Sequence, residues 1–250
     1  MTATVSPRAT DLHTAYRMAF TDWLACAAAG AGERAARAVR AGGEDLAADV
    51  VFAATAGHVL DFDDTLPEGV AHVSAAAAPA ALVVAADRGR SLSDALDAYA
   101  LGYEAMAAVA AAGHPALYDA GWHPTAVCGP AGAAVAAATL LRLSPAQGDT
   151  ALAIAMLRAG GTRGAFGSDG KAIQVGQAAA AGVQSALLAR AGAIVDDRSP
   201  ARPRISTSST TAWPPSSRFP TASPSPCCGA RRGARPSPRS TPRCASVRAR

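Results

Sequence analysis

Carboxylates, histidines and a lysine stand at three places before residue 172 of this 250-residue chain, and such groups transfer protons and hold anions. The first place is H-V-L-D-F-D-D-T at 58 to 65, at the end of an apolar stretch with helical periodicity. Pro67 disfavours helical geometry at the residue before it, so we expect this helix to end near Thr65. Three carboxylates would then face the negative end of the helix macrodipole, which costs about 0.3 to 1 kcal/mol for each. A local rule broken in this way is typical of a functional site.

The spacing of residues on that helix decides which of the polar side chains lie on the same face. At about 100° per residue, His58, Asp61 and Thr65 share one face. Asp63 points elsewhere, so we expect it to be solvated. The alternative is an ordinary surface turn in which all three acids are solvated. His72 follows in a short loop, where a lone histidine is commonly a surface residue.

The second place is W-H-P-T at 122 to 125, after the turn-forming Gly121. Pro124 suits the first position of a helix, which places His123 at the positive end of that helix. This field favours the neutral imidazole, the form that accepts a proton, and the same helix end binds anions. The alternative is a histidine that packs beside Trp122 for structure alone.

The third place is G-G-T-R-G-A-F-G-S-D-G at 160 to 170, which leads into Lys171, the only lysine of the chain. Ala165 stands where a phosphate-binding loop needs a glycine, and Ala172 stands where it needs a hydroxyl, so we exclude such a loop. The segment predicts a backbone that presents one ammonium group to a substrate carboxylate, with Arg163 as a nearby second cation. The alternative is a glycine-rich connection with an incidental lysine.

Helices must position all three segments, because apolar residues up to position 195 recur at helical rather than alternating spacing. Ser91 and Ser144 predict two N-caps, since Asp94 and Gln147 follow three residues later. Alanine and glycine are abundant in every segment, which lets helix axes approach closely and predicts an all-α bundle of about seven helices. Such helices bury little apolar area each, which favours a homo-oligomer. The expected helices cover roughly 9–29, 44–65, 75–87, 91–112, 125–141, 144–158 and 172–191.

The charge of the chain divides at Val195. Residues 1–195 have 12 Lys and Arg against 17 Asp and Glu, whereas residues 196–250 have 11 Arg against 2 Asp and are rich in Ser, Thr and Pro. We therefore expect one folded domain at 1–195 and a low-complexity, disordered tail at 196–250. The folded part is acidic and the tail lacks an aromatic stacking pattern, which argues against nucleic-acid binding.

Hydropathy and cysteine usage indicate a soluble protein. The uncharged runs at 122–141 and 172–189 suit a membrane poorly, because one contains prolines and glycines and the other three glutamines. Cys26 and Cys128 stand alone in apolar stretches, which is typical of buried thiols in a reducing compartment. The N-terminus does not have the pattern of a secretory signal. We expect a cytoplasmic protein.

Five segments combine these features: G-H-V-L-D-F-D-D-T at 57–65, H-V-S-A at 72–75, A-L-G-Y-E at 100–104, G-W-H-P-T at 121–125 and G-K-A-I-Q-V-G-Q-A-A at 170–179. In order and spacing they resemble the MmgE/PrpD family, which includes 2-methylcitrate dehydratase, cis-aconitate decarboxylase and iminodisuccinate epimerase. The resemblance extends over about residues 10–195. It implies a helical domain that carries most of an active site, a smaller α+β lid domain and a homodimer. It also implies action on small di- and tricarboxylates without a metal or another cofactor.

Carried over by position, the resemblance also implies site residues. Val73 stands where the family's H-P-S element has proline, and Gln174 stands where many members have a histidine. The implied site residues are Asp61, Thr65, His72, His123 and Lys171.

These residue types agree with the implied chemistry. Removing water from a β-hydroxy acid needs a base for a carbon-bound proton and cations that hold carboxylates. We expect His123 and His72 to be base and acid, in an order that the sequence leaves open. Lys171 and Thr65 would hold carboxylates, and Asp61 would orient a histidine. The expected activity is that of a hydro-lyase most like 2-methylcitrate dehydratase, with an epimerase, a decarboxylase and an inactive helical dimerisation module as alternatives.

The lid domain that the resemblance implies would begin soon after Val195. There the sequence changes abruptly to Arg, Ser, Pro and Thr with clustered cysteines, which is typical of out-of-frame translation of a GC-rich gene. We therefore expect the lid to be absent, with a natural disordered tail as the alternative.

Overall fold

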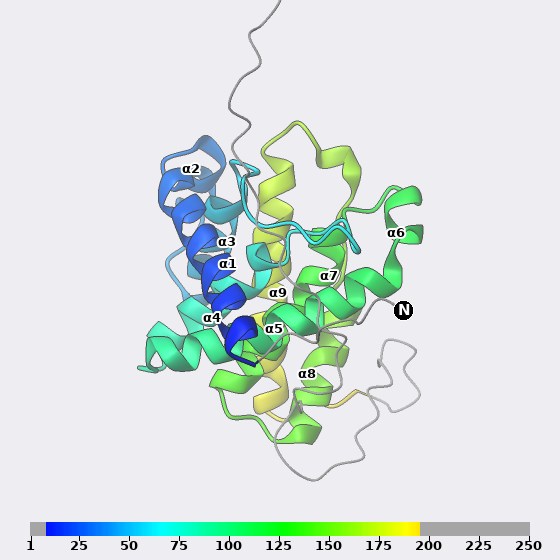
Figure 1. The fold of residues 1–250 in the computed structure, drawn as a ribbon. Coiled ribbons are helices and arrows are strands. Elements are labelled where there is room, and N and C mark those ends of the chain that lie inside the picture. Colours follow the sequence, from blue (N-terminus) through cyan, green and yellow to red (C-terminus); the bar gives the residue numbers. More distant parts are fainter. Residues whose placement is uncertain (1–8, 196–250) are drawn as a thin grey trace, which may run out of the picture.

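The computed structural model describes residues 9–195, and within them the chain forms nine α-helices and one short 3-10 helix (Figure 1). No strand forms in this part beyond two isolated β-bridges. The predicted all-α class is therefore confirmed for these residues, whereas the predicted tail at 196–250 lies outside them. The elements are α1 (Ala9–Gly30), α2 (Arg34–Arg40), α3 (Leu46–His58), α4 (Ser74–Asp87), α5 (Leu92–Gly113), α6 (Ala116–Asp119), α7 (Pro124–Leu140), α8 (Pro145–Leu157), η1 (Arg163–Ala165) and α9 (Gly170–Arg190).

Capping interactions begin the helices where the sequence predicts them. The Ser91 hydroxyl accepts the N–H of Asp94 at 3.1 Å, and the Asp94 carboxylate accepts the N–H of Ser91 at 3.0 Å. Ser144 begins α8 with the same capping box. Pro124 is the first residue of α7 and His123 is its N-cap. A candidate site residue is thus placed by a local helix-start signal.

Small residues let α7 and α9 pack closely in the middle of the bundle, with α1, α2 and α3 to one side and α6 to the other (Figure 1). A Cβ atom added at Gly182 of α9 would lie 2.5 Å from the carbonyl oxygen of Pro130 in α7. A Cβ atom at Gly102 of α5 would lie 2.6 Å from the carbonyl oxygen of Gly132. No side chain fits at either crossing, so glycine allows the helix axes to come this close.

Larger side chains fill the space between α1 and α5. The rings of Phe20 and Tyr99 pack edge to face with centroids 5.2 Å apart, and Tyr103 lies 5.9 Å from Tyr99. Cys26 and Cys128 are buried, as predicted. Among the described helices, none combines the length and the apolar character that crossing a bilayer requires.

The structure corrects the predicted end of one helix. α3 ends at His58, seven residues before the predicted end at Thr65. Asp61 adopts a left-handed backbone with φ of 59°, which a continuing α-helix does not allow. The acids that follow His58 therefore lie in a loop, and the predicted conflict with the helix macrodipole does not occur. The short helices α2 and α6 also lie outside the predicted set.

Candidate active site

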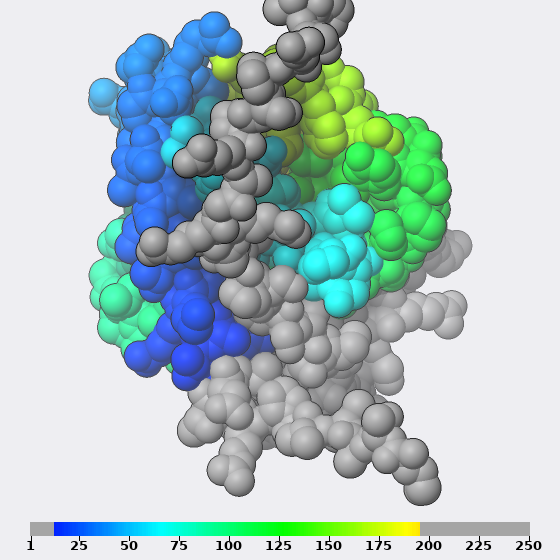
Figure 2. All heavy atoms as spheres, turned by 45° about the horizontal axis from the view of Figure 1, so that its top comes forward, coloured from blue at the N-terminus to red at the C-terminus, as the bar shows by residue number. Residues whose placement is uncertain are grey.

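Four segments meet at one end of the bundle. They are the loop 59–73 after α3, the N-terminus of α7, the segment 158–169 and the first turns of α9. Figure 2 shows the loop (cyan) at the surface, beside the green segment around α6 and the yellow-green segment that precedes α9. A β-bridge between Trp122 and Thr162 joins the α7 side to the glycine-rich segment.

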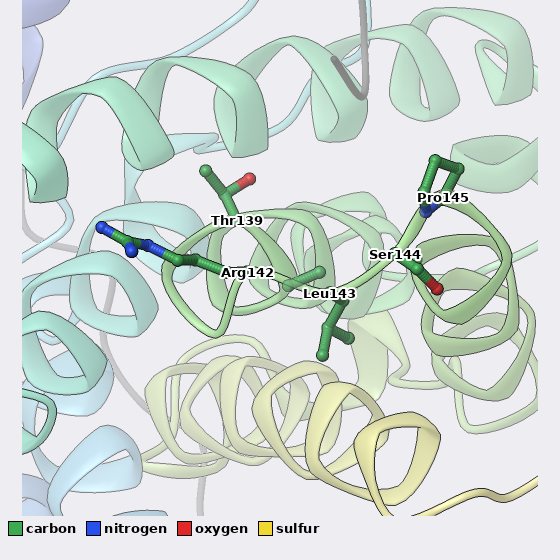
Figure 3. A pocket seen from close by; sticks show the side chains of 7 residues that line it. Thr139, Arg142, Leu143, Ser144 and Pro145 are labelled. Carbon is green, nitrogen blue, oxygen red and sulfur yellow. The ribbon is translucent and has the colours of Figure 1, made fainter. Parts of the chain in front are cut away.

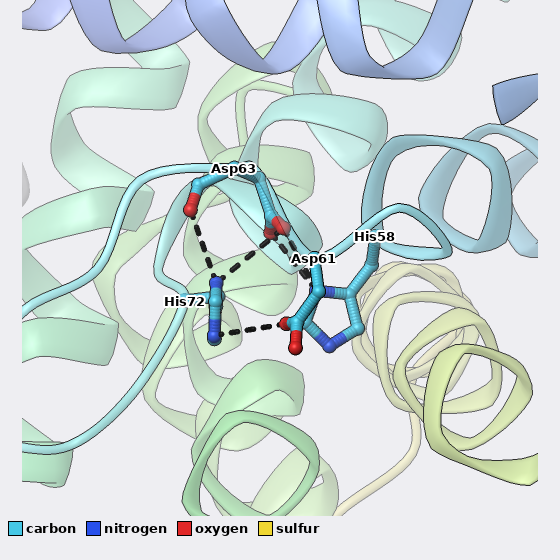
Figure 4. A group of neighbouring side chains, drawn as sticks. All are labelled: His58, Asp61, Asp63 and His72. Atoms are coloured by element: carbon cyan, nitrogen blue, oxygen red, sulfur yellow. Dashed lines mark hydrogen bonds and ion pairs between the residues drawn. The ribbon is translucent and has the colours of Figure 1, made fainter. Parts of the chain in front are cut away.

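Asp63 is the buried centre of this site. It is 1% exposed, and its two carboxylate oxygens lie 3.1 and 3.0 Å from Nδ1 of His58 (Figure 4). Nδ1 of His72 lies 3.4 Å from the same carboxylate. Burial acts to raise the pKa of Asp63, but the two imidazoles outweigh it and hold that pKa well below its usual range. The prediction that Asp63 is solvated is wrong, because the helix on which that prediction rests ends at His58.

His72 stands between Asp63 and Asp61 (Figure 4). Its Nδ1 donates to the carbonyl oxygen of Asp63 at 3.1 Å, and its Nε2 lies 3.4 Å from the Asp61 carboxylate. Its backbone N–H donates to the hydroxyl of Thr125 in α7 at 3.0 Å. Burial acts to lower the pKa of His72, but the hydrogen bond to Asp63 and the charge of that group raise it above its ordinary value. His72 is thus oriented at Nδ1 and presents Nε2 toward a second carboxylate.

Lys171 reaches the same carboxylate from α9. Its ammonium group donates to Asp61 in a short ion pair, and the Asp61 side chain remains 55% exposed. Burial acts to raise the pKa of Asp61, whereas the hydrogen bond and charge of Lys171 lower it, with a net lowering. The Lys171 ammonium also lies 5.4 Å from the centroid of the Phe166 ring. A solvent-facing carboxylate thus holds the cation at the mouth of the site.

His123 lies deeper, at the start of α7. It is 2% exposed, its ring stacks on that of His58 at 6.0 Å, and Phe166 meets it edge to face at 5.0 Å. Burial lowers the pKa of His123 to about 3, and the charges of His58 and Lys171 act in the same direction. His123 is therefore a neutral imidazole at neutral pH, whereas the pKa of His72, whose ring contacts the other side of the same cluster at His58, is raised.

Two further predicted residues lie near this cluster in different roles. Thr65 lies half-buried in the loop, four residues after Asp61. Arg163 places its guanidinium carbon 3.8 Å from the centroid of the Tyr118 ring and donates to the Tyr118 carbonyl oxygen at 2.9 Å. In this structure Arg163 ties the glycine-rich segment to α6, and its contact with a substrate stays a prediction.

The structure adds residues that sequence reasoning did not select. His58 and Asp63 form the buried pair, and Gln174 contacts His123. Asp64 is also buried, with its Oδ1 accepting the N–H of Ser74 at 3.2 Å, and burial raises its pKa to about 6. The run D-F-D-D places three acids in four residues beside apolar neighbours, and this crowding is the sequence signal that could have indicated a buried carboxylate.

The cluster also has spacing that suits a metal ion. His58, Asp61, Asp63 and His72 can each offer a ligand atom, all within 4.8 Å of one another. However, the Asp63 oxygens already accept hydrogen bonds from imidazole, and the ammonium of Lys171 adds positive charge beside Asp61. Both features favour a hydrogen-bonded proton relay over a cation site.

A separate surface hollow lies where α7 turns into α8 (Figure 3). It has a volume of about 240 Å³ and is lined by residues that include Thr139, Arg142 and Ser144. Among the described residues that line it, Arg142 is the one charged residue, and none is a histidine or an acid. Its described lining residues thus offer no histidine or carboxylate for proton transfer, in contrast to the histidine cluster.

Comparison with known families identifies the chain. A model of the MmgE/PrpD N-terminal domain matches residues 2–198, a range that contains every residue of the cluster. A search of curated proteins finds no match. Because the family model covers well over half of its length, the chain belongs to the MmgE/PrpD family.

Proposed function

We propose that this site eliminates water from a small hydroxy-tricarboxylate, most like 2-methylcitrate, by histidine-mediated acid–base chemistry. The observation that carries the proposal is the contrast between two neighbouring histidines. The environment raises the pKa of His72 and lowers that of His123. Titratable groups whose pKa values are pushed apart within one site are typical of an assigned acid–base pair.

Cationic and dipolar groups at the site suit a polyanionic substrate. Lys171 stands in the first turn of α9, and its partner Asp61 is half exposed, so a substrate carboxylate can replace Asp61 on the ammonium. The N-terminus of α7 adds the positive end of the helix macrodipole beside His123. Thr65 and Arg163 are proposed as further substrate contacts. Together these groups would hold two carboxylates and leave the carbon between them near the histidines.

Phe166 controls access to the deeper histidine. Its ring contacts His123 and lies 5.4 Å from the Lys171 ammonium, while 39% of it is exposed. Gly167 follows it with φ of 78°, a conformation that glycine adopts without strain. Movement of Phe166 would open His123 to a substrate held by Lys171.

The alternative reactions also need a group that takes a proton from carbon or gives one to it. An epimerase or isomerase returns the proton to carbon, and a decarboxylase loses carbon dioxide from a related acid, so each could use this set of groups. We propose the dehydratase first, acting in a cytoplasmic homodimer. The homodimer rests on the low apolar area that alanine-rich helices bury.

The proposal is tested by incubating the purified chain separately with 2-methylcitrate, cis-aconitate and iminodisuccinate and following each by NMR. Unsaturated product from 2-methylcitrate supports the dehydratase, whereas turnover of only one of the other acids supports the corresponding alternative. His123→Ala is expected to abolish turnover with unchanged helicity by circular dichroism. A folded dimer by light scattering that converts none of the acids would instead indicate a helical dimerisation module.

A further inference from the structure

The side chain of Gln174 is held at three points. Its Oε1 accepts the N–H of Thr162 at 3.1 Å, and its Nε2 donates to the carbonyl oxygen of Thr162 at 3.2 Å. A backbone N–H cannot accept and a carbonyl oxygen cannot donate, so this double contact fixes which end of the amide is oxygen and which is nitrogen. The second proton of Nε2 then points to Nδ1 of His123, 2.5 Å away.

That contact determines the tautomer of His123. Because the amide nitrogen donates, Nδ1 of His123 must be the unprotonated acceptor, and the ring proton of the neutral imidazole must be on Nε2. We propose that Gln174 is a positioning residue that holds His123 as the Nε2–H tautomer, so that His123 acts as a hydrogen-bond donor to a substrate oxygen and not as the base.

His72 has the opposite arrangement. Its Nδ1 lies 3.1 Å from the carbonyl oxygen of Asp63, which can only accept, so Nδ1 carries a proton. In neutral His72 the lone pair is therefore on Nε2, next to Asp61 and its partner Lys171. The two histidines thus present different groups, a basic nitrogen at His72 and an N–H donor at His123.

The assignment of the proton transfer rests on the proposed function and follows from this difference between the two histidines. Nε2 of His72 takes the carbon-bound proton as that C–H bond breaks, and the electron pair forms the carbon–carbon double bond as the C–O bond breaks. The same Nε2–H then gives the proton to the departing hydroxide, which leaves as water. His123 donates its Nε2–H to the carboxylate oxygen on which enolate charge develops, as a neutral imidazole does in other enzymes.

The residues around the contact between Gln174 and His123 restrict the positions of both side chains. Gly161, with φ of 130°, accepts the N–H of His123 at 3.0 Å, and a Cβ atom there would lie 3.1 Å from Oε1 of Gln174 and 2.5 Å from the Cβ atom of Ala126. The charged and titratable groups that act on His123 are His58 from α3, His72 and Asp61 from the loop, and Lys171 from α9. The cationic members of this set oppose a second proton on the ring.

Long-range ¹H–¹⁵N NMR of the histidine rings tests the assignment without any substrate, since it distinguishes protonated from unprotonated ring nitrogens. The signals of His123 are identified by their loss in His123→Gln. We expect the full chain to show His123 with protonated Nε2 and unprotonated Nδ1 throughout pH 5 to 9. Gln174→Glu places a carboxylate oxygen at Nδ1, and the single ring proton is expected to move from Nε2 to Nδ1. Gln177→Glu, on the exposed side of the same helix, is the matched control and is expected to leave the His123 signals unchanged.

The outcomes separate this inference from the proposed function. A protonated Nδ1 in the unmodified chain, or an identical His123 spectrum in Gln174→Glu, would overturn the tautomer assignment whether or not the chain turns over any acid. If the tautomer is as assigned, kinetics then test the role: Gln174→Glu should lower kcat about 100-fold, the usual loss of one transition-state donor, with KM little changed. An unchanged kcat would remove His123 as the donor while leaving the spectrum intact.

Discussion

Asp63 and His58 form a completely buried pair, with the carboxylate 3.0 Å from Nδ1 of an imidazole only five residues earlier in the chain. The pair joins the last residue of α3 to the loop that carries the other site groups. Nε2 of His58 is buried with no hydrogen-bond partner among the described residues, so the ring is held by the contact with Asp63, an edge-to-face contact with His72 and stacking on His123. The loop is therefore attached to the bundle through a buried hydrogen bond from an imidazole to a carboxylate.

Asp63→Asn tests that attachment. The Asp63 carboxylate accepts from the buried Nδ1–H of His58, and loss of such a charge-assisted hydrogen bond corresponds to about 1.5 to 3 kcal/mol, so we expect a loss of this size in the free energy of unfolding at pH 7, measured by urea denaturation. The folded pKa of Asp63 is depressed, so its contribution is complete above the unfolded value near 3.9 and is lost as pH falls. The difference between the two proteins should thus shrink below about pH 4. The surface pair Arg40–Asp49 is the control, and Asp49→Asn should cost less than about 1 kcal/mol.

Asp64→Asn is expected to act in the opposite direction. Burial raises the pKa of Asp64 to about 6, so the folded state binds more protons than the unfolded state between about pH 4 and pH 6. The unmodified chain should lose stability as pH rises through that range, by roughly 1 to 3 kcal/mol for this group. The variant should lack that loss and melt at the same or a higher temperature at pH 8. Equal slopes of melting temperature against pH from 4 to 6 would show that Asp64 does not titrate in this way.

Lys171→Gln should weaken the binding of substrate carboxylates. Loss of one charge-assisted hydrogen bond corresponds to about 1.5 to 3 kcal/mol, which is roughly a 10- to 150-fold rise in Kd for cis-aconitate by isothermal titration calorimetry. Arg142→Gln changes a cation of equal charge in the separate hollow between α7 and α8, and should leave this Kd unchanged. Equal losses in the two variants would mean that net charge, and not the site, binds the acid.

Gly102→Ala tests the close approach of α5 and α7. The added Cβ atom would lie 2.6 Å from the carbonyl oxygen of Gly132, so the helices must move apart, at a cost of about 1 to 3 kcal/mol in the free energy of unfolding. Gly32→Ala has open space around its Cβ position and serves as the control, with little expected change. Thermal unfolding followed by circular dichroism measures both, and equal stability of the two variants would contradict tight packing at this crossing.

Much of the helical frame could be predicted from sequence because its signals are local. Ser91 and Ser144 with their partners three residues later, and Pro124 after His123, each specify a helix start within a few residues. Alanine and glycine content predicted close helix packing. Helices as short as α2 and α6 offer too few periodic residues to be detected in this way.

The interior of the site could not be predicted because it depends on one backbone change and on distant contacts. The left-handed conformation of Asp61 ends the helical spacing of side chains, and because of this change Asp63 points inward to His58. Pairing of Lys171 with Asp61 spans 110 residues, and no local pattern indicates it. The structure brings the three segments together, but it buries Asp63, which the helical spacing predicted to be solvated, and leaves the Asp61 side chain half exposed.

His72 is proposed to take and return a carbon-bound proton in this site. The most direct measurement is deuterium incorporation into 2-methylcitrate in D₂O, followed by NMR with the unmodified chain and with His72→Gln. We predict exchange at the carbon beside the carboxylate with the unmodified chain and a loss of at least about 100-fold in the variant. Exchange that survives in His72→Gln, or a folded unmodified chain that binds the acid and exchanges no proton, would contradict the claim.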